Sequence, residues 1–276
     1  MVGSREELRD RLIDAFAARD EIYRICLFGR EVARRQDAYS DIDIIVYSGD
    51  PARTRAEYAG VLAGISPIRA TFPLGGTPEW YSEMVMLRDY NPYHKVDFSI
   101  GGKEDWPRVT VYDDPEKPQL SVSVLREVTL HDDVVRKLTD VLFSVPRFTK
   151  CLFRRDVDMY RRWESITDLA LVLLYERHFG WQPELPSRRL ALYETQCLLE
   201  VLDPEEVVDL DHIRPTGGRL DLALSYQAAV KLIVALSEQK ACAQHKPLDP
   251  CFTHTMVAFL DAEIARYLAL RTPPAD

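Results

Sequence analysis

The sequence has little of what marks secreted or membrane proteins. Its five cysteines are an odd number and lie scattered along the chain, which does not suggest a disulfide framework. The hydrophobic stretches are short and interrupted by charges, so we expect no membrane span. Residues 1–20 carry the charged side chains Arg5, Glu6, Glu7 and Arg9, which contradicts a secretory signal. These absences favour a cytoplasmic protein with reduced thiols.

Positive charge is also scarce. The chain has 35 lysine and arginine residues against 44 aspartate and glutamate residues, a formal net charge of −9. The basic residues form no long tract, which argues against extended nucleic-acid binding, where neutralisation of phosphates dominates affinity. An acidic enzyme can still bind a triphosphate if metal ions screen the repulsion. The negative net charge favours a cationic acceptor, but it decides only between acceptors that are otherwise equally supported.

The pattern of hydrophobic residues divides the chain in two. Ser4 and Glu7 have capping-box spacing before a first helix, and Asp50-Pro51 starts a second. Strand-like segments follow one another up to about residue 125, at 22–28, 41–47, 69–72, 84–87, 95–100, 108–112 and 122–125. Helical periodicity then covers 131–145, 150–179, 187–202, 219–240 and 252–271. We therefore expect an α+β protein, with a mixed sheet flanked by helices at 1–130 and an all-helical domain at 131–276.

One constellation in the first half points to chemistry. A strand ends at Gly29, and after a polar connection Asp41 and Asp43 open the next strand. Alternate residues of a strand point to the same face, so the two carboxylates can reach one site. Magnesium prefers oxygen ligands and is usually held by one or two carboxylates together with substrate phosphates. The missing side chain of Gly29 lets a phosphate approach the main chain.

This arrangement resembles the nucleotidyltransferase superfamily, which includes DNA polymerase beta and the antibiotic nucleotidyltransferases. The family pattern is a strand, Gly-Ser or Gly-Gly, a short helix, and Asp-x-Asp on the next strand. The matching segments here are Leu27-Phe28-Gly29-Arg30 and Ser40-Asp41-Ile42-Asp43. A third acidic residue on a later strand stands in His94-Lys95-Val96-Asp97. The resemblance covers roughly the first 130 residues.

The resemblance implies a magnesium site made by Asp41, Asp43 and Asp97, with ATP or another nucleoside triphosphate as co-substrate. Asp97 is expected as a metal ligand or as the base for the acceptor hydroxyl. Nucleotide contacts are expected from Gly29, Arg30, Arg34 and Ser40. Arg30 departs from the family, which has serine or glycine there. Its guanidinium can replace the serine as a charged donor to phosphate, or its bulk can obstruct the pocket.

The function implied is transfer of a nucleoside monophosphate, AMP from ATP first of all, to a hydroxyl of a small molecule. By resemblance, an aminoglycoside or lincosamide antibiotic is the acceptor to consider, which implies a role in antibiotic resistance. The helical domain would supply acceptor and nucleotide contacts, and a homodimer stays open. Two alternatives also stay open: a nucleotide-binding pseudoenzyme, and a regulatory or antitoxin-type protein acting on a protein partner.

Other patterns have simpler interpretations beside the functional one. Cys242, His245, Cys251 and His254 have the residue types of a zinc site, but the short connection between the pairs favours an ordinary helix junction. Two further Asp-x-Asp pairs, at 156–158 and 209–211, are interpreted as solvated charges. The basic pairs at 154–155 and 161–162 either lie on the solvated face of an amphipathic helix or hold phosphate.

Overall fold

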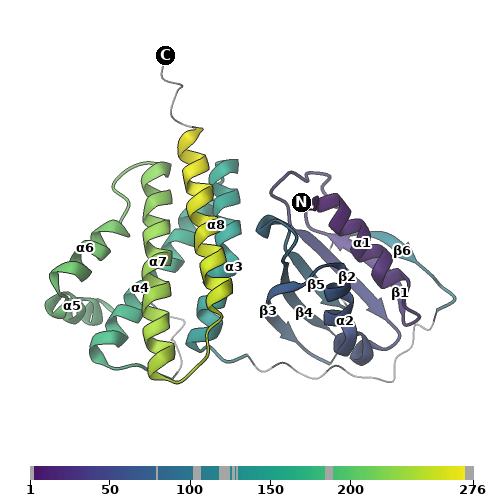
Figure 1. Cartoon of the computed structure of the whole chain (residues 1–276), viewed down its shortest axis with the longest axis horizontal. Helices are drawn as coiled ribbons and strands as arrows, with labels where there is room; N and C mark the ends of the chain where they lie inside the picture. Colours follow the sequence, from purple (N-terminus) through teal and green to yellow (C-terminus); the bar gives the residue numbers. More distant parts are fainter. Residues whose placement is uncertain are drawn as a thin grey trace, which may run out of the picture. The chain divides into compact units, whose positions relative to one another are not determined.

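The computed structural model describes residues 3–78, 80–101, 107–117, 125, 128, 130–183 and 189–270. The chain divides into two compact units, Met1–Leu130 and His131–Asp276. The first contains a β-sheet with helices packed on it, and in its described residues the second contains helices only (Figure 1). This confirms the α+β class expected from the sequence. We call the two parts the sheet unit and the helical unit.

The sheet unit has six strands in the order β3-β4-β5-β2-β1-β6. Strands β2 and β5 are parallel neighbours, and every other neighbouring pair is antiparallel. The expected strand at 122–125 lies outside the described residues except for Leu125, which belongs to no strand. The strands are β1 (Ile22–Phe28), β2 (Ile42–Ser48), β3 (Ile68–Gly76), β4 (Tyr81–Leu87), β5 (Val96–Ile100) and β6 (Arg108–Asp113), with a 3-10 turn η1 (Pro92–His94) before β5.

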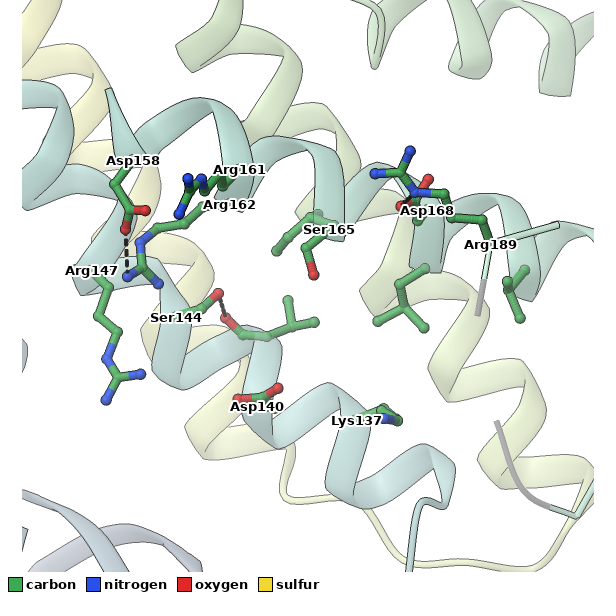
Figure 2. A pocket seen from close by; sticks show the side chains of 14 residues that line it. Lys137, Asp140, Ser144, Arg147, Asp158, Arg161, Arg162, Ser165, Asp168 and Arg189 are labelled. Carbon is green, nitrogen blue, oxygen red and sulfur yellow. Dashed lines mark hydrogen bonds and ion pairs between the residues drawn. The ribbon is translucent and has the colours of Figure 1, made fainter. Parts of the chain in front are cut away.

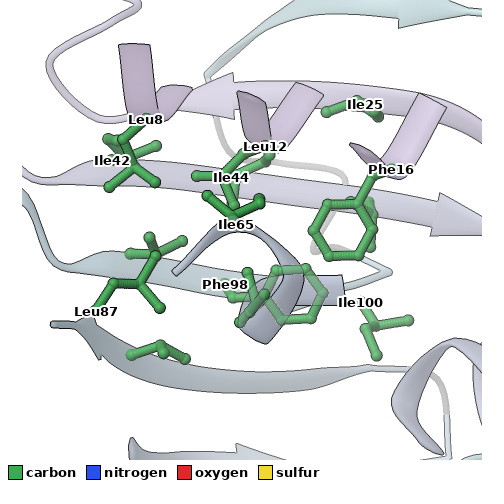
Figure 3. Close-up of a cluster of buried hydrophobic side chains, with 14 of the residues drawn as sticks. Leu8, Leu12, Phe16, Ile25, Ile42, Ile44, Ile65, Leu87, Phe98 and Ile100 are labelled. Carbon is green, nitrogen blue, oxygen red and sulfur yellow. The ribbon is translucent and has the colours of Figure 1, made fainter. Parts of the chain in front are cut away.

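Two helices cover one face of this sheet, α1 (Arg5–Ala17) and α2 (Pro51–Ile65). Both begin at the caps expected from the sequence: the Ser4 hydroxyl accepts from the Glu7 amide at 3.0 Å, and the Asp50 carboxylate accepts from the Arg53 amide at 3.0 Å. The apolar stripe of α1, which is Leu8, Leu12 and Phe16, is fully buried. Figure 3 shows this stripe lying over the side chains of β2 and β5.

The burial of one face of β2 decides where its polar side chains lie. Ile42, Ile44 and Val46 are completely buried in the core beneath α1 and α2. Because side chains alternate along a strand, Asp43 lies on the opposite face of the sheet. A shift of one residue in register would place the carboxylate in the apolar core, so hydrophobic burial fixes the orientation of the strand.

The helical unit consists, in its described part, of α3 (Val134–Arg154), α4 (Asp158–Phe179), α5 (Leu192–Val201), α6 (Pro204–His212), α7 (Arg219–Ala243) and α8 (Pro250–Ala269). The sequence placed a break near residues 146–149, but α3 runs through Pro146 and ends at Arg155, whose φ is +57°. Helix α6 was not expected. Pro204 is its first residue, and Asp203 with Glu206 forms a capping box, so this proline begins a helix instead of separating two.

Helix α7 corrects one expectation about hydrophobic stretches. By length and composition alone it would be able to cross a membrane, since an 18-residue window has a mean hydropathy of 1.4. Half of that window is buried, and α7 packs against α3, α4 and α8. Its buried Lys240 pairs with Glu176 of α4. These contacts are those of the central helix of a bundle, whose apolar surface is covered by its neighbours.

Candidate active site

The parallel pairing of β2 and β5 brings two of the expected acidic residues together. Asp43 and Asp97 are direct partners in the register of the two strands. Partners on neighbouring strands project from the same face, so both carboxylates lie on the face of the sheet opposite the core. Asp41 stands two residues before Asp43 and, by the same alternation, belongs to this face. The three aspartates predicted from the sequence are thus placed on one side of one strand pair.

Gly29 is required by the geometry at the end of β1. Its φ is +63°, in the left-handed region, and a Cβ built there would lie 2.2 Å from Oδ2 of Asp43. A side chain at this position would collide with the carboxylate and would also strain the backbone. The sequence attributed this glycine to the approach of a phosphate. The structure shows a second reason, because the glycine makes room for Asp43.

The connection from Gly29 to β2 contains turns in place of the expected short helix. It is held by Arg5, whose side chain is only 3% exposed although it stands in the first turn of α1. Its Nε donates to the carbonyl oxygens of Ser40 and Asp41 at 3.2 Å each, and its Nη2 pairs with Glu31. Arg5 therefore anchors the backbone that presents Asp41. The sequence counted Arg5 only among the charges that exclude a signal peptide.

The other expected nucleotide contacts lie in this connection and already have local roles. Arg30 is 40% exposed, donates to the carbonyl of Arg35 at 3.3 Å and lies 3.8 Å from the Asp37 carboxylate. The hydroxyl of Ser40 is buried and donates to Asp37 at 3.0 Å, which closes a turn. Arg34 is exposed and has a φ of +49°. Contact of Arg30, Arg34 and Ser40 with a nucleotide stays a prediction.

Lys95 is a central member of the site that sequence reasoning did not identify as such. Its side chain is 1% exposed, and its Nζ lies 3.1 Å from Oδ2 of Asp41 while also pairing with Asp97. The spacing Lys95-x-Asp97 was the available signal, since it places both residues on one face of a strand. The contact with Asp41 could not be read from the sequence, because it depends on the pairing of β5 with β2.

Three carboxylates and one ammonium meet at this strand pair. Lys95 pairs with Asp41 and Asp97, and Asp43 stands beside them in the register of the strands. Carboxylate oxygens are ligands that suit a hard divalent cation such as magnesium. Asp41 and Asp97 keep access to solvent, with side chains 14% and 17% exposed. The donor set therefore fits the expected metal, and Lys95 would compete with it for the same oxygens.

Within the described ranges, no group of three or more His, Cys, Asp or Glu side chains is already arranged to hold a metal ion. The Lys95 ammonium pairs with both Asp41 and Asp97, in the place that a metal ion bound by these two side chains would take. A metal site made by the aspartates stays a prediction. The cysteine and histidine pairs around 242–254 lie where α7 ends and α8 begins. Cys242 and Cys251 are exposed free thiols.

Comparison with known proteins finds few similarities. No protein-family model matches the chain, and no curated protein matches it. Among solved structures, it is similar to an aminoglycoside 6-adenyltransferase from Bacillus subtilis, with 12% sequence identity and a TM-score of 0.35. The similarity covers 95% of this chain and 98% of that one.

Proposed function

We propose that the protein is a metal-dependent nucleotidyltransferase that moves AMP from ATP to a hydroxyl group of a small molecule. One observation carries the proposal. Asp43 and Asp97 are register partners on the parallel strands β2 and β5, with Asp41 on the same face and Gly29 leaving room beside them. This is a compact set of oxygen ligands next to a tight turn, as transfer of a phosphate-bound group requires.

Each side chain has a role in this proposal. Asp41 and Asp43 would hold magnesium, which when bound neutralises charge on the triphosphate. Asp97 would accept the proton of the acceptor hydroxyl. The acceptor oxygen forms a bond to the α-phosphorus, the bond from that phosphorus to the α–β bridging oxygen breaks, and pyrophosphate leaves with the bonding electrons. Lys95 would act as a positioning residue that keeps Asp41 and Asp97 together across the two strands.

Aminoglycoside and lincosamide antibiotics are the acceptors to test first. They carry hydroxyl and amino groups, and the net charge of −9 favours an acceptor that is a cation. The choice of acceptor follows the family resemblance of the Gly29, Asp41 and Asp43 pattern. The nucleotide is proposed on the same ground.

The test is a mass-spectrometric transfer assay with magnesium, ATP and a panel of these antibiotics. Because each substitution removes a charged ligand of the magnesium that stabilises the reacting phosphates, Asp41→Asn and Asp43→Asn should each lower the rate by about a hundredfold to a thousandfold. Helix α6 offers a matched control, since Asp209 and Asp211 form a second, exposed Asp-x-Asp pair. Asp209→Asn and Asp211→Asn should leave transfer unchanged. Transfer that persists in Asp41→Asn and Asp43→Asn would exclude the assigned site.

A second candidate is a nucleotide-binding protein that does not transfer. The contacts of Lys95 favour it specifically, because its ammonium pairs with two of the three carboxylates that would otherwise hold metal. Calorimetry with magnesium and ATP separates the two candidates. Binding without turnover on any acceptor supports the second, whereas a nucleotide-modified product supports the first.

A further inference from the structure

The helical unit contains a cavity of about 620 Å³, and the described residues that line it all belong to this unit. It lies between α3 and α4, with Arg189 at its edge, and Figure 2 shows the side chains around it. Ligand pockets usually measure about 300 to 1,000 Å³, so this cavity is large enough for a small organic molecule. Nothing in the proposed transfer reaction assigns a role to it.

Two polar stripes, one on each helix, line the cavity. Residues three or four apart lie on the same face of a helix, and the lining side chains follow this spacing. On α3 they are Lys137, Asp140, Ser144 and Arg147, and on α4 they are Asp158, Arg162, Ser165 and Asp168. The apolar residues of both helices are buried against α7 and its neighbours. Packing of the bundle therefore explains the apolar faces but not why two charged stripes surround one hollow.

The lining has more positive than negative groups. Five cations stand against three carboxylates in the wall. Two of these carboxylates are paired with lining cations, Asp158 with Arg162 at 2.9 Å and Asp168 with Arg189 at 2.8 Å. Burial raises the pKa of the third, Asp140, while the nearby Arg147 and Lys137 lower it in part. The cavity is thus positive in an otherwise acidic protein.

One buried donor in this wall lacks a partner. Within the described part of the chain, Nε of Arg162 is buried and has no hydrogen-bond acceptor. A buried donor without an acceptor is destabilising, and an anionic ligand would supply the missing acceptor. Figure 2 shows Arg147, Arg161 and Arg162 at the same end of the cavity, so this end carries three of the lining cations.

We propose that this cavity binds a small polyanion, carrying phosphate or carboxylate groups, through Arg147, Arg161 and Arg162. Guanidinium groups suit such ligands because their planar donors match two oxygens at once. The inference extends beyond nucleotidyl transfer, and it does not depend on that reaction. The competing interpretation is that these arginines are only the solvated faces of amphipathic helices.

The test is calorimetry on the full chain in buffer containing EDTA, which removes metal-dependent binding near Asp41. Pyrophosphate, citrate and ATP are the anionic probes, and spermine is the cationic one. The difference between pyrophosphate and citrate separates phosphate from carboxylate ligands, and that between pyrophosphate and ATP shows whether a nucleoside adds affinity. We expect at least one anion to bind more tightly than about 1 mM, and spermine not to bind at the cavity.

Two variants connect binding to the cavity. Arg147→Gln combined with Arg161→Gln should weaken anion binding about tenfold or more, because two charge-assisted contacts are lost. Ser165→Phe should also weaken binding, by filling the cavity without changing its charge. Lys231→Gln on α7 is the matched control: it removes a half-exposed cation that pairs with Asp261 and does not line the cavity, so binding should stay within about twofold.

The outcomes decide the proposal. Equal anion affinity in the wild type, the double arginine variant and Ser165→Phe would overturn the proposal. Spermine binding that is present in the wild type and abolished in these variants would also overturn it. Absence of binding by all three anions up to about 10 mM would do the same. Anion binding that survives in Asp43→Asn, together with loss of transfer, shows that the two sites are separate. Failure of one proposal therefore leaves the other standing.

Discussion

Each unit of the protein buries a lysine, and the two lysines differ in what surrounds them. Lys240 of α7 is 0% exposed and pairs with Glu176 of α4, which is 4% exposed. Lys95 of the sheet unit is 1% exposed but pairs with two aspartates that reach solvent, while a third lies beside them. In the helical unit one cation balances one carboxylate. In the sheet unit one cation pairs with two carboxylates.

This difference separates a structural ion pair from a candidate reactive site. Burying charge is costly, so a pair that only joins two helices is best closed to water and neutral overall. The Lys240 pair meets both conditions, and Glu176 also accepts from the amide of Gln182. The carboxylates of Asp41 and Asp97, by contrast, reach solvent at 14% and 17% exposure, as groups that bind a cation or a substrate must.

The largest effect on stability should follow from breaking the balanced pair. Lys240→Met leaves the Glu176 carboxylate buried without its cation, and we expect a loss of about 3–5 kcal/mol in the free energy of unfolding, measured with urea. The double variant Lys240→Met with Glu176→Leu should recover most of this loss, because both charges are then absent. A single variant as stable as the wild type would contradict a structural role for the pair.

A buried carboxylate hydrogen-bonded to a tyrosine hydroxyl offers a third case. Glu83 of β4 is 2% exposed and accepts a hydrogen bond from the Tyr58 hydroxyl. Burial raises the pKa of Glu83 to about 7, against a partial lowering by Arg55. The native state thus holds the proton more tightly than the unfolded state, so stability should fall as the pH rises from about 4.5 to about 7 and stay low above it.

Glu83→Gln tests this directly. At pH 8 the variant should be more stable than the wild type by as much as about 3 kcal/mol, since glutamine has no charge to bury. Below about pH 4.5 the two proteins should be equally stable, because the glutamate is then protonated in both states. Urea unfolding at several pH values measures the difference. A stability difference that does not change with pH would argue against the raised pKa.

Lys95→Met should have the smallest effect on stability, about 1–2 kcal/mol, because water can reach the Asp41 and Asp97 carboxylates that lose their partner. Its main consequence should be a new dependence on metal. Manganese or magnesium should raise the melting temperature of Lys95→Met more than that of the wild type, since the metal no longer competes with an ammonium. Asp43→Asn combined with Lys95→Met should reduce that gain. Equal metal response in Lys95→Met and the wild type would contradict competition.

Much of the sheet unit follows from local rules in the sequence. The caps at Ser4 and Asp50, the alternation in 41–47 and the stop at Gly29 each depend on neighbouring residues only, and each was predicted correctly. The helical unit was harder. The expected ranges 131–145 and 150–179 left a gap around Pro146 although α3 continues through it, and Pro204 was taken as a separator although it begins α6. A proline is compatible with both outcomes, and the surrounding packing decides between them.

The sequence by itself determined that Asp41 and Asp43 share a face, because side chains alternate along any strand. The sequence also has a glycine, Gly29, at the end of β1, where φ is positive. Only the tertiary structure decided that β5 lies parallel to β2, and with it that Asp97 faces Asp43 and that Lys95 joins Asp41. The burial of Arg5 and the cavity between α3 and α4 depend on it as well. Such contacts join residues far apart in the chain, and no periodicity within one segment encodes the partner it will meet.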